Sequence, residues 1–114
     1  MDSKLVAYAF LGLAIVSEVI GSTFLQKSEQ FTKAIPTLIL AVCYLAAFYF
    51  LSLALKAIPL GVAYGIWGSV GIALTAFVGY FVFNQKLDLA AIIGISLMIS
   101  GVIVIQVFSK SVSH

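Results

Sequence analysis

The stretch Leu5–Leu25, LVAYAFLGLAIVSEVIGSTFL, decides how the rest of the chain is interpreted. It is long and apolar enough for a membrane-spanning helix, because about 20 apolar residues cross the hydrocarbon core of a bilayer. Near its middle it carries one acidic residue, Glu18. A carboxylate at that depth costs about 2.5 kcal/mol or more, and such residues usually belong to substrate or proton pathways. We therefore expect Glu18 to bind and release a proton and to offer its carboxylate to a cation.

The composition indicates an integral membrane protein. Of the 114 residues, 63% are hydrophobic and 9% are charged, whereas soluble domains have about 45–50% and about 25%. So few charges cannot cover a water-soluble surface. The net charge of +2 comes with six scattered lysines and no basic patch, so we expect no nucleic-acid partner. The single cysteine, Cys43, excludes an intrachain disulfide and a cysteine-based metal cluster.

Charged residues and prolines divide the chain into four apolar segments, which predict membrane spans over residues 5–25, 34–55, 60–83 and 89–108. The expected fold class is all-α, with four transmembrane helices in one domain of residues 1–114 and neighbouring helices antiparallel. The N-terminal stretch could instead be a cleaved signal peptide. It is too long for one, Glu18 interrupts it, and no small-x-small cleavage site follows.

Four spans place both termini on one side of the membrane and divide the lysines equally between the two sides. Each side carries three: Lys4, Lys56 and Lys110 on one, and Lys27, Lys33 and Lys86 on the other. The positive-inside rule therefore gives no preferred orientation. Either the chain inserts both ways, or folding and a partner decide. We favour dual insertion, since pairing with an inverted copy recreates the inverted repeat of many alternating-access transporters.

The helix face around Glu18 consists mostly of small residues. Positions three and four away, and one turn further, are Leu11, Ala14, Ile15, Gly21 and Ser22. Small residues leave room beside the carboxylate for a ligand or a neighbouring helix, and Ser22 offers a hydroxyl. The alternative is a structural glutamate bonded to another helix. That alternative is weak, because no Lys, Arg or His lies within a span to pair with Glu18.

Aromatic residues on the second and third segments are candidates for binding an organic cation. Tyr64 and Trp67 are three positions apart and share a helix face, where cation–π attraction can act. The alternative is an interfacial belt, but Trp67 lies nearer the middle of its span than a belt residue should. Tyr44 is a further candidate, with ordinary helix packing as its alternative, and Tyr8 is another.

Small residues in the third segment predict a hinge. Gly68, Ser69 and Gly71 weaken the helix locally and suit a bending point for alternating access. A plain packing role is the alternative for these positions.

The fourth segment has no charge and carries a stripe of small residues, Gly94, Ser100 and Gly101. This stripe is typical of a tight seam between helices. We expect the fourth helix to be the dimerisation element and to lie outside the site. The chain contains no phosphate-binding loop, metal-ligand cluster or nucleophile–base pair, so we expect neither enzymatic activity nor a metal or other cofactor.

These motifs resemble the small multidrug resistance transporters over nearly the whole chain. The quotable stretches are AIVSEVIGSTFLQKSEQFTK, FYFLS, IPLGVAYGIW and QKLDLAAIIG. The resemblance implies an antiparallel, dual-topology homodimer in a bacterial inner membrane, which exchanges protons for hydrophobic cations with both copies of Glu18 in one site. Carried over position by position, the implied site residues are Glu18, Leu11, Ala14, Ile15, Ser22, Tyr44, Tyr64 and Trp67, with Tyr8 nearby.

The resemblance also bears on substrate. Guanidinium exporters of this family typically carry a tryptophan three residues after the glutamate, where this chain has Gly21. The small residue is similar to the drug-exporting branch, which accepts quaternary ammonium and phosphonium ions. After Trp67 the chain reads Gly-Ser where drug exporters often read Ser-Gly. That variant is similar to some members that work as unlike pairs, including polyamine exporters, so a heterodimer remains an alternative.

The leading hypothesis is multidrug efflux by alternating access, with proton and cation competing for Glu18. Low dielectric disfavours a lone charged carboxylate, so it holds a proton until a cation replaces it. The alternatives are export of guanidinium or polyamines, and a structural subunit of a membrane complex in which Glu18→Gln would leave function intact. A channel is disfavoured, because no polar stripe lines a pore.

Overall fold

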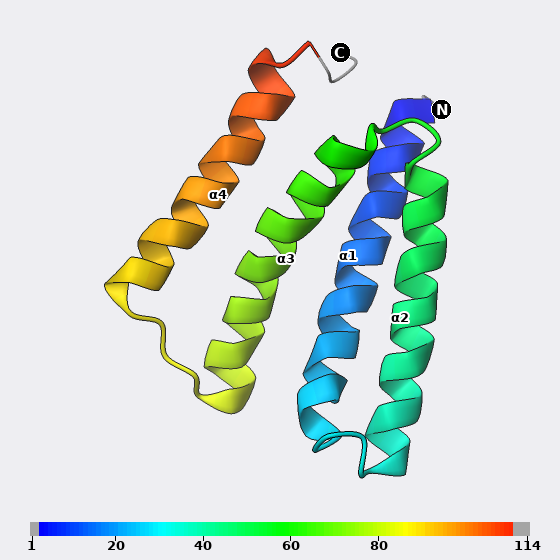
Figure 1. Ribbon diagram of the computed structural model, residues 1–114, viewed down its shortest axis with the longest axis vertical. Coiled ribbons are helices and arrows are strands. Elements are labelled where there is room, and N and C mark those ends of the chain that lie inside the picture. The colour runs from blue at the N-terminus through cyan, green and yellow to red at the C-terminus, as the bar shows by residue number, and fades with distance from the viewer. Residues whose placement is uncertain (1–2, 111–114) are drawn as a thin grey trace.

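The computed structural model describes residues 3–110, which form four α-helices joined by short connections (Figure 1). The helices are α1 (Ser3–Lys27), α2 (Ala34–Ala54), α3 (Leu60–Phe83) and α4 (Leu89–Phe108). Each is long and apolar enough to cross a membrane. The prediction of an all-α fold with four transmembrane helices is confirmed.

The residues at the helix ends explain where each helix begins. α1 extends two residues beyond the predicted span at each end, and Lys27 in its last turn suits the negative end of the helix dipole. α2 carries Pro36 in its first turn, where a missing N–H is harmless. Pro59 directly precedes α3, and the side chain of Asp88 caps α4 by accepting a hydrogen bond from the Ala91 N–H at 2.9 Å.

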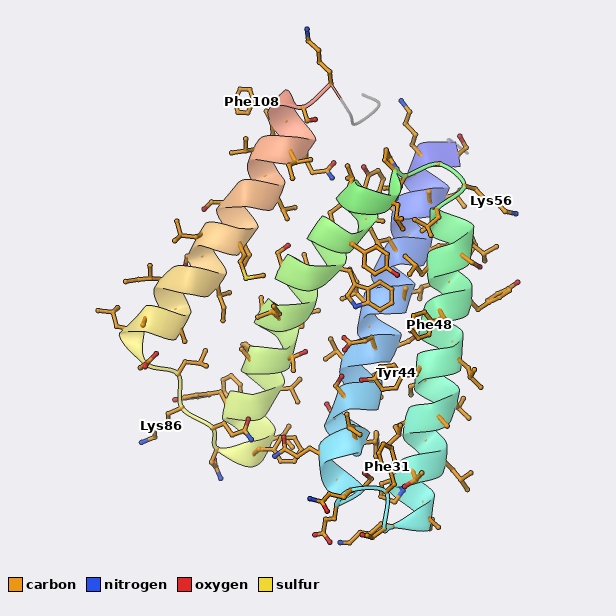
Figure 2. All side chains as sticks on the ribbon, in the orientation of Figure 1. Phe31, Tyr44, Phe48, Lys56, Lys86 and Phe108 are labelled. Carbon is orange, nitrogen blue, oxygen red and sulfur yellow. The ribbon has the colours of Figure 1, made fainter. Side chains whose placement is uncertain are left out.

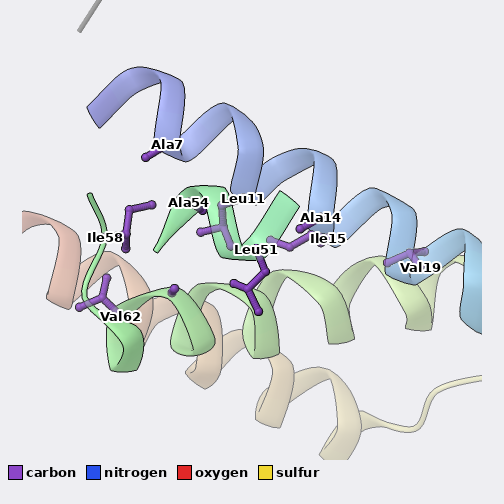
Figure 3. Close-up of a cluster of buried hydrophobic side chains, with 10 residues drawn as sticks. Ala7, Leu11, Ala14, Ile15, Val19, Leu51, Ala54, Ile58 and Val62 are labelled. Atoms are coloured by element: carbon purple, nitrogen blue, oxygen red, sulfur yellow. The ribbon is translucent and has the colours of Figure 1, made fainter. Parts of the chain in front are cut away.

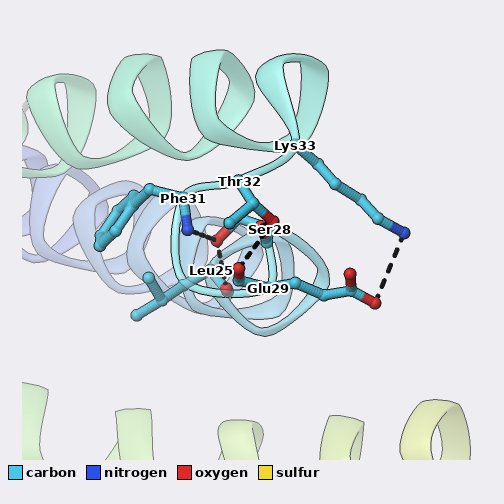
Figure 4. Close-up of polar contacts among 6 residues, drawn as sticks. All are labelled: Leu25, Ser28, Glu29, Phe31, Thr32 and Lys33. Carbon is cyan, nitrogen blue, oxygen red and sulfur yellow. Dashed lines mark hydrogen bonds and ion pairs between the residues drawn. The ribbon is translucent and has the colours of Figure 1, made fainter.

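The α1–α2 connection is organised by Ser28, which is fully buried (Figure 4). Its Oγ donates to the carbonyl of Leu25 at 2.7 Å and accepts from the N–H of Phe31 at 3.2 Å. Three consecutive residues, Glu29, Gln30 and Phe31, have left-handed φ values of 49°, 64° and 65°. Such values are strained for residues with a Cβ, so the hydrogen bonds of Ser28 hold the turn in place.

α1 is the central helix of the packing. It lies along α2 and also contacts α3, whereas α4 packs on α3 at the edge of the molecule (Figure 1). The core gathers at the N-terminal half of α1, where Leu11 meets Leu51, Ile58 and Val62 (Figure 3). α4 buries none of its residues. In Figure 1 the α1–α2 and α3–α4 connections lie towards the same end of the molecule, and the α2–α3 connection lies at the other.

α3 is one continuous helix through the predicted hinge of Gly68, Ser69 and Gly71. Ser69 is buried, and its hydroxyl donates to the carbonyl of Gly65 at 2.9 Å. In this conformation the segment is therefore an ordinary helix with a satisfied serine, and bending there stays a prediction.

The two glycines of the predicted seam on α4 face open space within the described chain. A Cβ added at Gly94 or Gly101 would meet no atom within 4 Å. The hydroxyl of Ser100 is used inside the helix, where it donates to the carbonyl of Ser96 at 2.8 Å. The stripe is thus available to a partner, and its role in dimerisation stays a prediction.

Candidate functional site

Glu18 lies in the wall of a cavity of about 480 Å³ between α1, α3 and the start of α4. This volume falls within the usual range for small-molecule sites, about 300–1,000 Å³. The residues of the wall that the sequence predicted as functional are Glu18, Ser22, Trp67, Gly68 and Gly71. The structure therefore brings the carboxylate of α1 and the tryptophan of α3 to one space.

A chain of hydrogen bonds leads from α2 to the carboxylate. The hydroxyl of Ser22 donates to Glu18 Oε1 at 2.8 Å, and Ser22 Oγ lies 2.7 Å from the hydroxyl of Tyr44. A serine hydroxyl has one proton to donate. When Ser22 uses that proton in the hydrogen bond to Glu18, the hydrogen bond between Ser22 and Tyr44 must be donated by Tyr44. Tyr44, which points from α2 towards α1 in Figure 2, thus supports the carboxylate through Ser22 from outside the cavity wall.

Gly21 allows this arrangement because it has no side chain. A Cβ there would lie 3.1 Å from Cys43 Cβ and 3.2 Å from the Tyr44 ring, closer than ordinary contact. The ring of Tyr44 fills the space that a larger residue would need. The tryptophan that the resemblance associates with guanidinium export has no room in this packing.

Trp67 is held within an aromatic group contributed by α2 and α3. Its ring stacks on Tyr64 with centroids 6.3 Å apart, and it lies 6.4 Å from the ring of Phe48. A Cβ at Gly71 would lie 3.8 Å from Glu18 Oε2 and 4.0 Å from Trp67 Nε1. The carboxylate and the indole therefore flank the same space. Tyr64 is half exposed and is not in the cavity wall, but its ring stacks on Trp67, which is.

Four other predicted contact residues lie outside the cavity wall. Leu11, Ala14 and Ile15 are buried in the core between the helices (Figure 3). The hydroxyl of Tyr8 donates to Gln106 Oε1 of α4 at 3.2 Å. Their roles in binding stay predictions, and in this chain the first three shape helix packing.

The wall also contains residues that the sequence did not single out, namely Ile72, Thr75, Ala76, Gln85, Leu87 and Ile95. Thr75 lies four and eight positions beyond Gly71 and Trp67, so extending their helix face would have found it. Gln85 and Leu87 come from the α3–α4 connection, whose path no periodicity predicts. Ile95 belongs to α4, so α4 contributes one residue to this cavity, and the expectation that α4 lies outside the substrate site stays a prediction.

The cavity wall combines one carboxylate with hydroxyl, aromatic and apolar groups. The lysines of the described chain lie at helix ends or in connections, and none is in the cavity wall. Within residues 3–110, no group of three His, Cys, Asp or Glu side chains could hold a metal ion. The wall offers one carboxylate, hydroxyls, an indole and apolar surface. This set of groups suits a hydrophobic organic cation.

Comparison with known proteins agrees with this arrangement. A family model described as "Small Multidrug Resistance protein" matches residues 6–98. The chain is 45% identical to the multidrug transporter EmrE of Escherichia coli K12 over 107 residues, which are 94% of this chain and 97% of that protein. It is 43% identical to the quaternary ammonium compound-resistance protein QacE of Escherichia coli, with the same coverage. It is 50% identical to the multidrug resistance protein EbrB of Bacillus subtilis over 97 residues, which are 85% of this chain and 83% of that protein.

Proposed function

The chain belongs to the small multidrug resistance family, and from that premise we propose that it exports hydrophobic and quaternary ammonium cations across a bacterial inner membrane in exchange for protons. The observation that carries the proposal is the position of Glu18. Its carboxylate lies in the wall of a cavity of about 480 Å³, beside Trp67 and away from the lysines. The names of the relatives, which concern multidrug transport and quaternary ammonium resistance, support the same reading.

The proposed mechanism is competition for one carboxylate. In a low-dielectric site the charge of a carboxylate is offset either by a bound proton or by a bound cation, and the two exclude each other at Glu18. Ser22, backed by Tyr44, donates a hydrogen bond to Glu18 and so holds the carboxylate in position for the cation. The indole of Trp67 then offers an aromatic face to the same cation. These attractions are weakly directional, which is what broad substrate specificity requires.

The proposed working form is an antiparallel homodimer that changes access when a proton or a cation is bound. Two features support it: the equal division of lysines between the two sides, and a fourth helix that buries none of its residues and leaves Gly94 and Gly101 uncovered. In this dimer Glu18 of a second copy would share the site. The packing of Gly21 against Tyr44 supports the drug-exporting branch over guanidinium export.

The experiment is proton release on addition of tetraphenylphosphonium to the purified protein in weak buffer. We expect the wild type to release protons and Glu18→Gln to release none. Glu29→Gln is the matched control, because it removes the same charge from an exposed loop residue paired with Lys33 at 3.5 Å. It should behave as the wild type does.

The other outcomes decide among the alternatives. No proton release from the wild type would contradict the proposal, and guanidinium and polyamines would be the next ligands. Release without uptake of cation into proteoliposomes under a pH gradient would refute exchange while retaining the shared site. A purified protein that binds no cation, together with intact function in Glu18→Gln, would favour a structural subunit of a membrane complex.

A further inference from the structure

The α3–α4 connection brings an amide side chain to the Glu18 cavity. Asn84 adopts a left-handed conformation with φ of 56°, which asparagine tolerates better than most residues. The backbone N–H groups of Asn84 and Gln85 both donate to the carbonyl of Gly79, the latter at 2.9 Å. The chain therefore folds back on the end of α3 and places Gln85 in the cavity wall.

Gln85 is seated against Gly79, where only a glycine leaves it room. A Cβ at Gly79 would lie 2.8 Å from Gln85 Oε1, nearer than real contacts allow. From this seat Gln85 Nε2 donates to Gln26 Oε1, in the last turn of α1, at 3.3 Å. One amide pair thus links the ends of α1 and α3 on the side of the molecule where the α1–α2 and α3–α4 connections lie (Figure 1).

A second, smaller cavity shares part of its wall with the Glu18 cavity. Its volume is about 40 Å³, enough for one water. Ser22, Thr75 and Gln85 line both cavities, and Gln26 lines only the smaller one. Polar groups therefore continue from the carboxylate to the amide pair, and both amides are exposed beyond it. The amide pair therefore lies at this edge of the cavity, where water can readily separate the two side chains.

We propose that Gln85 and Gln26 form a gate at this end of the Glu18 cavity, and that an organic cation using this end passes when the two amides separate. The gate rests on the proposed function, since it controls entry to the same site. A gate changes the rates of binding and release together, because it raises the barrier between two states without changing either. A residue that held the bound cation would instead change release and affinity.

The test uses the single tryptophan of the chain, Trp67, as its reporter. Stopped-flow fluorescence on the full-length protein would follow association and dissociation of tetraphenylphosphonium. We expect Gln85→Ala and Gln26→Ala each to raise both rates about three- to tenfold, the factor for one hydrogen bond. The Kd should stay within about twofold of the wild type. The double variant should be no faster than either single one, because each substitution removes the same pair.

Two more variants sharpen the result. Gly79→Ala pushes the flexible end of Gln85 from its seat while leaving both amides in the chain, so it should raise the rates similarly. Gln30→Gly is the matched control. It removes an exposed amide at the same end of the molecule, from a position whose φ of 64° suits glycine, and it should keep wild-type rates.

The contrary outcomes separate the gate from the proposed function. If the wild type binds with proton release but the Gln26→Ala rates are unchanged, the gate is wrong and the function stands. Additive effects in the double variant, or a higher Kd for Gln85→Ala alone, would make Gln85 a contact residue and would also overturn the gate. A wild type that neither binds the cation nor releases protons would overturn both proposals.

Discussion

Replacing Gly71 by alanine should weaken cation binding without weakening the fold. The added Cβ would lie 3.5 Å from Trp67 Cδ1 and 3.8 Å from Glu18 Oε2, which are ordinary van der Waals distances. No neighbouring atom has to move. Alanine also favours a helix over glycine by about 0.5–1 kcal/mol. The variant should therefore be as stable as the wild type or slightly more so.

The binding cost follows from where the methyl group lies. It occupies the space between the carboxylate of Glu18 and the indole of Trp67, the two groups that would hold the cation on this wall. A mismatch of one methylene in a fitted apolar pocket costs about 1–3 kcal/mol, or about 10–200-fold in affinity. We expect the Kd of tetraphenylphosphonium to rise at least about tenfold in Gly71→Ala.

Gly65→Ala is the comparison, since its Cβ would meet no atom within 4 Å and Gly65 is not in the cavity wall. Its Kd should stay within about threefold of the wild type. The assay is a titration of Trp67 fluorescence, with thermal unfolding in detergent as the check on folding. Wild-type affinity in Gly71→Ala, or an equal loss in both variants, would refute the reasoning. Gly68→Ala tests the predicted hinge: slower proteoliposome uptake at cation concentrations that saturate the site would indicate that bending at this position matters.

Three further changes test other contacts. Tyr44→Phe removes the phenol that supports the carboxylate through a serine, so the tetraphenylphosphonium Kd should rise about two- to tenfold; an unchanged Kd in the same titration would contradict the hydrogen-bond chain. Ser28→Ala leaves buried loop groups without partners and should cost about 1–3 kcal/mol, seen as a lower Tm in detergent; a wild-type Tm would show that the loop does not depend on Ser28. Asp88→Ala removes the cap of α4 and should cost about 1 kcal/mol, so amide exchange at Ala91 should rise about fivefold; unchanged exchange would mean that the cap contributes little.

The helices were predictable because the chain marks their limits with residues of strong local preference. Pro36 and Pro59 lie at helix starts, and Asp88 caps the last helix. Between these marks the apolar runs are long enough that only a helix satisfies the backbone in a bilayer. The end of α1 differs from the prediction by two residues, since Gln26 and Lys27 continue the helix beyond its apolar run.

The site was only partly predictable, because spacing gives a helix face but not what covers it. Ser22 and Glu18 are one turn apart, and spacing alone places them together. Ala14 is also one turn from Glu18, yet it is fully buried in the core. The reason is the course of α3 beside α1 (Figure 1). The early residues of α3 pack in the core with α1, and its later residues line the cavity. The way α3 lies against α1 is set by tertiary packing, which local residue spacing does not reveal. The same is true of the return of Gln85 to the cavity wall.

The edge position of α4 affects how cooperative unfolding should be. Its residues bury no area comparable to the shared core of the first three helices, and a hydrogen bond between Tyr8 and Gln106 is its tie to α1. In lipid an exposed apolar helix carries no hydrophobic penalty. Detachment of α4 from one chain should therefore be a local opening of low free energy, separate from loss of the core. A single Tm for this protein reports chiefly on α1, α2 and α3, and the state of α4 needs a probe of its own.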